Sequence, residues 1–182
     1  ELCMAWLHDE IGRAVGLPRV LGGIPLDQVG ATGFGLARCA EVAAPFCGLE
    51  LSGARVAVEG FGNVGQHAAR FLGALGCVLV AASDSQGAIR DDAGIDIDEL
   101  VQVKQRAGSV AAYGGQRISQ AELLTTDCEI LTPAARPDCI HADNAAQIRA
   151  RLILQGANIP ATAAAEQVLH ERGVLVVPDF IA

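Results

Sequence analysis

Three glycines and one acidic residue form the pattern in this chain that most clearly points to chemistry. Gly60, Gly62 and Gly65 follow a short apolar run, and Asp84 comes 19 residues after the last of them. The first glycine of such a set permits a tight turn out of a strand, the second lets the backbone approach a diphosphate, and the third lets a helix pack closely on the strand. An acidic residue about 20 residues further on bonds a ribose hydroxyl. The pattern therefore predicts a dinucleotide-binding turn.

The helix after the turn supplies the predicted phosphate site. Its first backbone N–H groups, around Asn63 and Val64, have no partner within a helix, and the positive end of the helix dipole lies beside them. They can hold a diphosphate without a lysine nearby, and Phe61 completes the turn between the glycines. A purely structural turn between strand and helix is the competing interpretation. The flanking strands, the helix and the placed acid favour the binding turn.

Asp84 and its neighbours indicate which dinucleotide the site prefers. A carboxylate at this place repels a 2′-phosphate, so NAD is favoured over NADP. The adjacent Ser85 brings no positive charge, although Arg90 follows shortly, and NADP stays possible. The single lysine of the chain, Lys104, lies on an expected outer helix among polar residues. We expect it to face solvent, as lysines usually do.

The turns after two further strands carry small or amide side chains. Ala134 and Ala135 follow the strand expected at 129–131, and Asn158 follows the strand expected at 152–154. Ligands of parallel sheets bind outside the carboxyl ends of the strands. Small side chains there leave room for a flat ligand, and the Asn158 amide offers a donor and an acceptor to a ribose or a carboxamide. An Asx-turn before the proline two residues on is the equal alternative for Asn158.

The elements that would position these residues alternate between strands and helices. Apolar runs predict strands, and periodic segments with caps predict helices. We expect strands at 56–58, 78–82, 129–131, 152–154 and 174–177. We expect helices at 2–15, at 32–47 with Thr32 as N-cap, from the glycine turn to residue 75, at 96–107 with Asp96 as N-cap, at 142–149 and at 161–172. A loop is expected at 21–30 and a turn at 112–117.

This alternation predicts an α/β fold of the Rossmann type, doubly wound, with a mostly parallel sheet and helices on both faces. An N-terminal linking helix precedes it. We expect two parts: residues 1–30 as a linking helix and loop, and residues 31–182 as a C-terminally truncated dinucleotide-binding domain.

Composition supports this class and excludes others. With 51% hydrophobic but only 4% aromatic residues, the core must consist of small and aliphatic side chains, as is typical of buried parallel strands. A net charge of −8 argues against nucleic acid and anionic membranes as partners, because phosphate surfaces need clustered Lys and Arg. Six cysteines without a Cys-x-x-Cys pair predict neither a disulfide framework nor a metal site, and they point to the cytoplasm.

The two ends of the chain resemble cuts. The sequence opens at Glu1 directly in a helical pattern and stops at Ala182 directly after an apolar strand. Neither a secretory leader nor an apolar run of about 18 residues is present in it. We therefore expect a fragment of a longer protein.

Six motifs, taken in their order along the chain, closely resemble the glutamate/leucine/phenylalanine/valine dehydrogenase family. They are Ala31-Thr32-Gly33, the turn from Glu59 to Gly65, Ser83-Asp84-Ser85, Pro133-Ala134-Ala135, Gly156-Ala157-Asn158 and the stretch from Pro178 to Ala182. The resemblance covers nearly the whole chain. Met4-Ala5-Trp6 resembles the helix that joins the substrate domain of this family to its cofactor domain.

The resemblance implies the cofactor domain of an NAD(P)-dependent amino acid dehydrogenase, which converts an L-amino acid to a 2-oxo acid and ammonia, and it suggests an oligomer. By the family pattern, the contacts are Thr32 with the nicotinamide carboxamide, Gly62 to Val64 with the diphosphate, Asp84 and Ser85 with the adenosine ribose, Ala134 and Ala135 with the groove, and Asn158 with the nicotinamide ribose. The catalytic lysines and aspartate belong to the family's substrate domain, so no catalytic residue is expected here. Gln28 replaces an arginine of many members, so the resemblance does not identify the amino acid.

Two other functions use the same glycine turn. A stand-alone NAD-binding sensor or regulatory module would need no substrate domain, but Thr32, the Ala134–Ala135 pair and Asn158 serve the nicotinamide end, which a sensor need not orient. Another two-domain NAD enzyme, such as a folate or alanine dehydrogenase, should lack the Met4-Ala5-Trp6 entry and the Pro178-Asp179-Phe180 exit.

Overall fold

The computed structural model describes residues 2–24 and 26–181. They divide into two compact units, the first ending at Ala31 and the second beginning at Thr32. The first unit contains α1 (Leu2–Ile11), a 3-10 turn (Arg19–Leu21) and α2 (Leu26–Val29). Pro25 and Ala182 lie outside the described residues, as does the side chain of Gln28.

Two predictions for the first unit need correction. The helix expected at 2–15 ends at Ile11, because Gly12 takes a positive φ of 73° and closes the last turn on the His8 carbonyl. The loop expected at 21–30 contains the four-residue helix α2. Glycines and prolines mark this segment as irregular, and they do not reveal a single helical turn between them.

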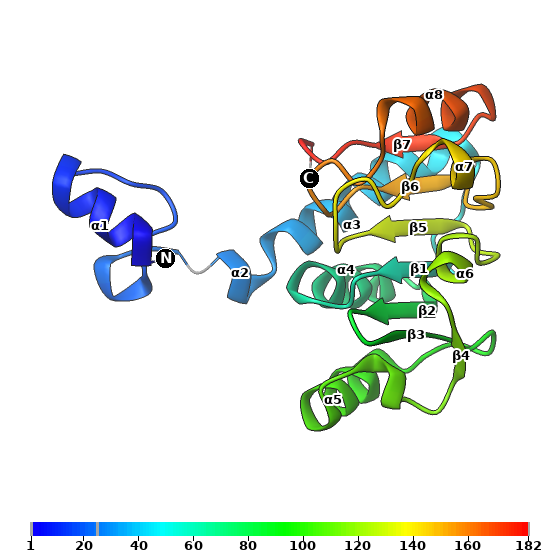
Figure 1. Cartoon of the computed structure of the whole chain (residues 1–182), viewed down its shortest axis with the longest axis horizontal. Helices are drawn as coiled ribbons and strands as arrows, with labels where there is room; N and C mark the ends of the chain where they lie inside the picture. The colour runs from blue at the N-terminus through cyan, green and yellow to red at the C-terminus, as the bar shows by residue number, and fades with distance from the viewer. Residues whose placement is uncertain (1, 25, 182) are drawn as a thin grey trace. The chain divides into compact units, whose positions relative to one another are not determined.

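The second unit is built on one sheet of seven strands, which lie side by side in Figure 1. The strands are β1 (Arg55–Glu59), β2 (Val78–Asp84), β3 (Gly87–Arg90), β4 (Gln116–Ile118), β5 (Ile130–Pro133), β6 (Leu152–Leu154) and β7 (Leu175–Val177). Their order is β4-β3-β2-β1-β5-β6-β7. The five strands from β2 to β7 in this order are parallel, whereas β3 and β4 are antiparallel to their neighbours. The predicted mostly parallel, doubly wound sheet is confirmed.

Helices cover both faces of this sheet. The helices of the unit are α3 (Ala31–Ala43), α4 (Asn63–Ala74), α5 (Ile97–Ala107), α6 (Gln120–Leu124), α7 (Ala142–Ala145) and α8 (Ala163–Glu171). One core joins α3, α4 and α5 to buried side chains of the sheet such as Val58, and the other joins α6, α7 and α8 to buried side chains such as Ala57. Successive residues of β1 thus enter opposite cores, as the alternation of side chains along a strand requires.

The structure corrects several predicted elements. The turn expected at 112–117 overlaps β4, and neither β3 nor α6 was predicted. β4 is a short strand with the sequence Gln-Arg-Ile at the edge of the sheet, so it lacks the apolar run that identifies a buried strand. The helix expected at 142–149 ends at Ala145. The helix expected at 161–172 spans Ala163–Glu171, with Thr162 as its N-cap.

The caps give one confirmed and one wrong prediction. Asp96 caps α5, its carboxylate accepting a hydrogen bond from the Glu99 N–H at 2.8 Å. Thr32 does not cap α3, because the helix already begins at Ala31. Gly48 ends this segment as expected, after a 3-10 turn from Ala44 to Cys47.

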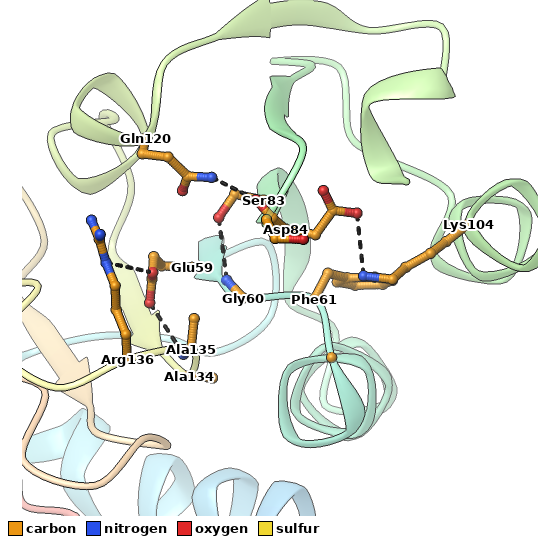
Figure 2. A pocket seen from close by; sticks show the side chains of 12 residues that line it. Glu59, Gly60, Phe61, Ser83, Asp84, Lys104, Gln120, Ala134, Ala135 and Arg136 are labelled. Atoms are coloured by element: carbon orange, nitrogen blue, oxygen red, sulfur yellow. Dashed lines mark hydrogen bonds and ion pairs between the residues drawn. The ribbon is translucent and has the colours of Figure 1, made fainter. Parts of the chain in front are cut away.

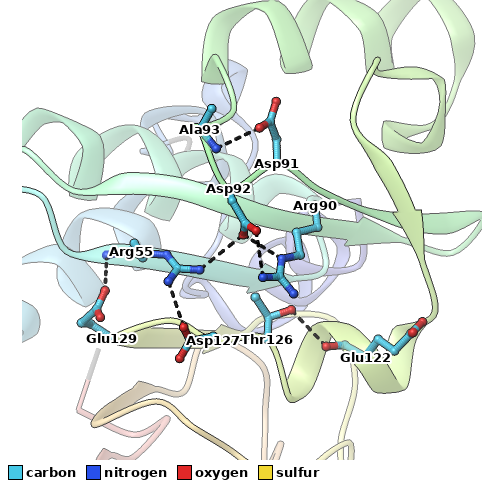
Figure 3. A network of polar contacts seen from close by, with 9 residues as sticks. All are labelled: Arg55, Arg90, Asp91, Asp92, Ala93, Glu122, Thr126, Asp127 and Glu129. Carbon is cyan, nitrogen blue, oxygen red and sulfur yellow. Dashed lines mark hydrogen bonds and ion pairs between the residues drawn. The ribbon is translucent and has the colours of Figure 1, made fainter.

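A polar network closes the amino end of β1 (Figure 3). The Arg55 N–H donates to Glu129 at 2.7 Å, and its guanidinium contacts Asp127 at 3.0 Å and Asp92 at 3.4 Å. Arg90 makes two further bonds to Asp92, at 2.8 and 3.0 Å. The network joins β1 to the turn after β3 and to the segment before β5. These bonds hold Arg90 at the amino end of β2, whereas Asp84 lies at the carboxyl end of that strand.

The strand order defines where a ligand is expected. From β1 the chain proceeds to β2 on one side, and it later returns to place β5 on the other side. The crevice outside the carboxyl ends of strands at such a switch point is the usual ligand site of open α/β sheets. Among the described residues, no helix has the length and apolar character needed to cross a membrane.

Candidate functional site

The glycine turn follows the carboxyl end of β1, and at two of its three glycines a side chain would clash with neighbouring atoms. Gly60 has a φ of +93°, and a Cβ atom on it would lie 2.7 Å from the backbone nitrogen of Ala135. A Cβ atom on Gly65 would overlap the carbonyl oxygen of Gly60 and lie 2.9 Å from Val58. The steric roles predicted for Gly60 and Gly65 are confirmed: one makes the turn, and the other lets α4 pack on β1.

Gly62 has the opposite surroundings. A Cβ atom on it would have nothing within 4 Å, and Gly62 is the N-cap of α4 without a capping side chain. The first N–H groups of this 12-residue helix, those of Asn63 and its successors, have no partner within the helix and lie at the positive end of its dipole, next to this open space at Gly62. This arrangement suits an anion that approaches the backbone closely.

Ser83 holds the turn from the neighbouring strand. The Gly60 N–H donates to the Ser83 hydroxyl at 3.2 Å, and the Phe61 N–H donates to the Ser83 carbonyl. Ser83 and Phe61 are both buried. In the sequence, the only sign of this role is a hydroxyl among the apolar residues of β2.

A cavity of about 580 Å³ opens outside the ends of β1, β2 and β5 (Figure 2). This volume lies within the range of small-molecule sites. Its walls contain Gly60, Phe61, Gly62, Asp84, Ser85, Ala134 and Ala135 from the predicted site, together with Glu59, Ser83, Lys104, Gln120 and Arg136. The structure thus brings together the turn, the acidic end of β2 and the small residues after β5.

Asp84 is held by four protein donors. One carboxylate oxygen accepts from the Gln86 N–H at 2.9 Å and the Ser109 hydroxyl at 3.0 Å, and the other accepts from the Val110 N–H at 2.8 Å and the Lys104 ammonium at 3.2 Å. Burial opposes ionisation of this side chain, which is only 7% exposed, but these hydrogen bonds outweigh burial and hold the pKa of Asp84 below its ordinary value. Asp84 is therefore a carboxylate at neutral pH.

The ion pair with Asp84 shows that the prediction for Lys104 was wrong. The side chain is 21% exposed and reaches from α5 to the carboxylate (Figure 2). Asp84 therefore does have a cation beside it, and that cation comes from α5, whereas Arg90 is engaged with Asp92. A lysine this close reduces the repulsion that the carboxylate exerts on a 2′-phosphate.

The opposite wall carries a second buried acid. The Glu59 side chain is 4% exposed, accepts a hydrogen bond from the Ala135 N–H at 3.2 Å and lies 3.8 Å from the Arg136 guanidinium. Burial dominates here and raises the pKa of Glu59, although the contacts with Ala135 and Arg136 oppose it. Gln120 on α6 closes this corner and donates to the Asp84 carbonyl at 2.6 Å.

A second cavity adjoins the first and shares Ala134 and Ala135 with it. Its other walls come from α3, the start of α4, the loops after β5 and β6, and the segment after β7, namely Thr32, Val64, Pro137, Gly156, Ala157, Asn158 and Asp179. Of the predicted site residues, only Asn63 and Gly65 line neither cavity. Gly65 is buried behind the turn, whereas Asn63 is exposed at the start of α4.

Gly33 places Thr32 beside this second cavity. A Cβ atom on Gly33 would lie 2.6 Å from the Ala68 nitrogen and 2.6 Å from the His67 Cβ, so α3 and α4 cross at a separation that a larger residue would prevent. Phe34 and Phe71 extend the contact edge to face, with ring centroids 5.4 Å apart. The close crossing carries the first turn of α3 to the start of α4.

Comparison with known proteins relates this geometry to one family. Residues 22–182 match the Glutamate/Leucine/Phenylalanine/Valine dehydrogenase family. The chain is 45% identical over 177 residues to a glutamate dehydrogenase of Thermotoga maritima, with 96% of this chain and 42% of that protein covered. It is 40% identical to an NADP-specific glutamate dehydrogenase of Saccharolobus shibatae, with 98% and 44% covered.

A solved structure agrees with these relatives. The hetero-hexameric glutamate dehydrogenase of Thermus thermophilus superposes with a TM-score of 0.84 at 33% identity, with 97% of this chain and 44% of that chain covered. The chain thus spans less than half the length of the curated relatives that it matches.

Proposed function

The chain belongs to the glutamate/leucine/phenylalanine/valine dehydrogenase family, and from this premise we propose that it is the cofactor-binding part of an NAD(P)-dependent amino acid dehydrogenase. The complete enzyme would convert an L-amino acid to a 2-oxo acid and ammonia. Residues 31–182 would form the dinucleotide-binding domain, and residues 1–30 would link it to a substrate domain. The groups that activate water and polarise the substrate would belong to that other domain.

The observation that carries this proposal is the pair of adjoining cavities on either side of the α4 N-terminus. The first cavity, with Asp84 and Ser85, would take the adenosine ribose, and the backbone from Gly62 to Val64 would bind the diphosphate. The second, with Thr32 and Asn158, would orient the nicotinamide, which accepts a hydride when bound. A sensor need not orient the nicotinamide for hydride transfer, so the second cavity favours the dehydrogenase.

We propose NAD as the preferred cofactor, with NADP as a weaker alternative. Asp84 is ionised and repels a 2′-phosphate, whereas Lys104 attracts one, and the two charges lie 3.2 Å apart. Each carboxylate oxygen of Asp84 already accepts two hydrogen bonds. A ribose hydroxyl can therefore bond to the carboxylate only by displacing one of the four donors. Lys104 is the donor that moves most easily, because its side chain is long and flexible. The other three donors are two backbone N–H groups and the Ser109 hydroxyl, which itself accepts from a backbone N–H.

The partners proposed for the complete enzyme are a small amino acid and further copies of itself. The hexameric relative named above supports an oligomer. All six cysteines are unpaired, which suits the reducing cytoplasm proposed as its location.

Fluorescence titration of the 182-residue chain with NADH and NADPH tests the proposal. We expect saturable binding of both with NADH the tighter ligand, because the ribose 2′-hydroxyl of NADH can donate a hydrogen bond to Asp84 and the 2′-phosphate of NADPH cannot. No amino acid oxidation is expected from this chain alone. Absence of NADH binding would reject the cofactor-binding function, and tighter NADPH binding would reject the order of preference.

A further inference from the structure

The loop after β6 contains a residue in a conformation that its side chain disfavours. Ile159 has a φ of +48°, and among residues 2–24 and 26–181 only one other non-glycine residue, Asp138 at +53°, has a positive φ. A β-branched residue in the left-handed region is a genuine outlier. Such conformations persist only where surrounding contacts enforce them, and they cluster at functional sites.

Two contacts enforce the conformation of Ile159. Its N–H donates to the carboxylate of Asp179 at 2.8 Å, and its carbonyl accepts from the N–H of Asp138 at 3.0 Å. Both backbone polar groups of Ile159 are therefore engaged. Asp179 comes from the segment after β7, 20 residues along the chain, so this bond ties two loops at the carboxyl edge of the sheet.

Asp179 is itself held in place. Its N–H donates to the side-chain oxygen of Gln155 at 3.3 Å, and the Gln155 amide donates to Glu166 on α8 at 3.2 Å. Gln155 is buried, with 2% exposure. The chain of contacts runs from α8 through the end of β6 to Asp179, and it fixes the direction from which the carboxylate meets the loop.

The loop presents Asn158, the residue directly before Ile159. Asn158 and Asp179 line the same cavity, whereas Ile159 does not line it and is 65% exposed. Ile159 instead lines a different cavity, which Asp179 also lines. The left-handed backbone of Ile159 comes directly after Asn158, so a change of this φ would redirect the chain next to Asn158.

We propose that Asp179 is a positioning residue, whose bond to the Ile159 N–H holds the loop in its left-handed conformation and presents Asn158 to the nicotinamide end of the groove. The inference rests on the proposed cofactor-binding function. A carboxylate suits this role because a charge-assisted hydrogen bond is stronger than a neutral one. The adenosine end, which has its own walls around Asp84, does not depend on Asp179.

Binding of NADH and of ADP by the 182-residue chain separates the two ends of the groove. Asp179→Ala should weaken NADH binding about tenfold and leave the affinity for ADP within about twofold, because ADP lacks the nicotinamide half. Asp179→Asn should retain most of the NADH affinity, since its amide oxygen can still accept from the Ile159 N–H. Asp91→Ala is the matched control: it removes one carboxylate that, like Asp179, is partly buried and accepts from a backbone N–H, here that of Ala93 at 2.9 Å in the turn after β3.

A second variant distinguishes positioning from direct contact with the cofactor. Glycine takes a positive φ without strain, so Ile159→Gly in the Asp179→Ala background should recover part of the lost NADH affinity. If Asp179 acted only by touching the cofactor, glycine at 159 would restore nothing, and the positioning role would be overturned.

The remaining outcomes are equally decisive. Unchanged NADH affinity in Asp179→Ala, or an equal loss of NADH and ADP affinity, would overturn the inference. Failure of the unsubstituted chain to bind either ligand would instead reject the proposed function, so the two failures are distinguishable.

Discussion

The Asp84 carboxylate shows why one residue does not decide cofactor preference in this fold. Its negative charge alone predicts rejection of a 2′-phosphate, yet the structure places the Lys104 ammonium 3.2 Å away. Charges this close act on a ligand as a pair, and the difference between their effects sets the preference. The sequence placed Asp84 correctly at the end of β2, because the spacing from the glycine turn is a local property. It did not predict Lys104, whose partner depends on where α5 packs.

Removing the charge of Lys104 should sharpen the preference for NADH. Lys104→Met keeps the length of the side chain but leaves the Asp84 carboxylate unopposed. We expect NADPH affinity to fall about tenfold, a change of about 1.4 kcal/mol, with a smaller effect on NADH. Fluorescence titration with both cofactors measures the ratio.

Arg106→Met provides the control for this experiment. Arg106 lies on the same helix, is exposed and donates from its side chain to the Gln102 carbonyl. Its replacement removes one positive charge, as Lys104→Met does, but not the one that contacts Asp84. Equal changes of the NADPH to NADH ratio in both variants would show that the general field of the protein, and not the Lys104–Asp84 pair, sets the preference.

Glu59 gives a prediction for the pH dependence of stability. Burial raises its pKa, so the folded state keeps the proton to higher pH than the unfolded chain, whose value is about 4.3. The stabilising contribution of Glu59 is therefore complete below that value and is lost as pH rises through the folded pKa. Glu59→Gln does not titrate, so the stability of the unsubstituted chain relative to this variant should fall as the pH rises from about 4.3 toward neutrality.

Urea unfolding at several pH values in this range measures that difference. Asp84, whose pKa is lowered, contributes with the opposite sign: its stabilisation is present at neutral pH and is lost as pH falls through the folded pKa. Because Asp84 is present in both proteins, its effect cancels in the comparison. A difference that stays constant or grows with pH would contradict the burial argument for Glu59.

At the scale of elements, the contact between β1 and α4 connects packing to the proposed binding. Gly65 is required because α4 lies directly on the turn, and Gly62 is required only if a ligand approaches the backbone there. The sequence predicted both roles, since they follow from glycine spacing between a strand and a helix. It did not predict β3 or β4, because these two short strands carry no long apolar run, and they form only by pairing, β3 with β2 and β4 with β3.

One substitution made at two positions separates these roles. Gly65→Ser should destabilise the chain by about 1–3 kcal/mol through overpacking against Gly60 and Val58. Gly62→Ser should leave stability unchanged or higher, because serine is a good N-cap and the space is open. The same serine should weaken NADH binding, since its hydroxyl bonds the N–H groups that would hold the diphosphate.

Denaturant unfolding and NADH titration of the two variants supply the measurements. Gly65→Ser is the packing control for Gly62→Ser, because the two changes add the same atoms to the same turn. Full NADH affinity in a stable Gly62→Ser variant would show that the diphosphate does not bind at the start of α4.

At the scale of the whole molecule, the order of motifs along the chain predicted the fold class and the family, because each motif is local and their succession follows the strand and helix succession. The order of motifs did not predict contacts between segments that are distant along the chain. The Asp179–Ile159 bond and the pairing of α3 with α4 through Gly33 arise only when β7 and α4 take their places. These contacts determine how the nicotinamide end of the proposed groove is built.

In the proposed complex, the dinucleotide spans both cavities, with its diphosphate at the start of α4. A crystal structure of the 182-residue chain with NADH tests this most directly. We predict phosphate oxygens within hydrogen-bonding distance of the Asn63 and Val64 N–H groups, adenosine beside Asp84 and nicotinamide between Thr32 and Asn158. NADH bound elsewhere on the protein, or bound with its diphosphate away from α4, would rule out this mode of binding.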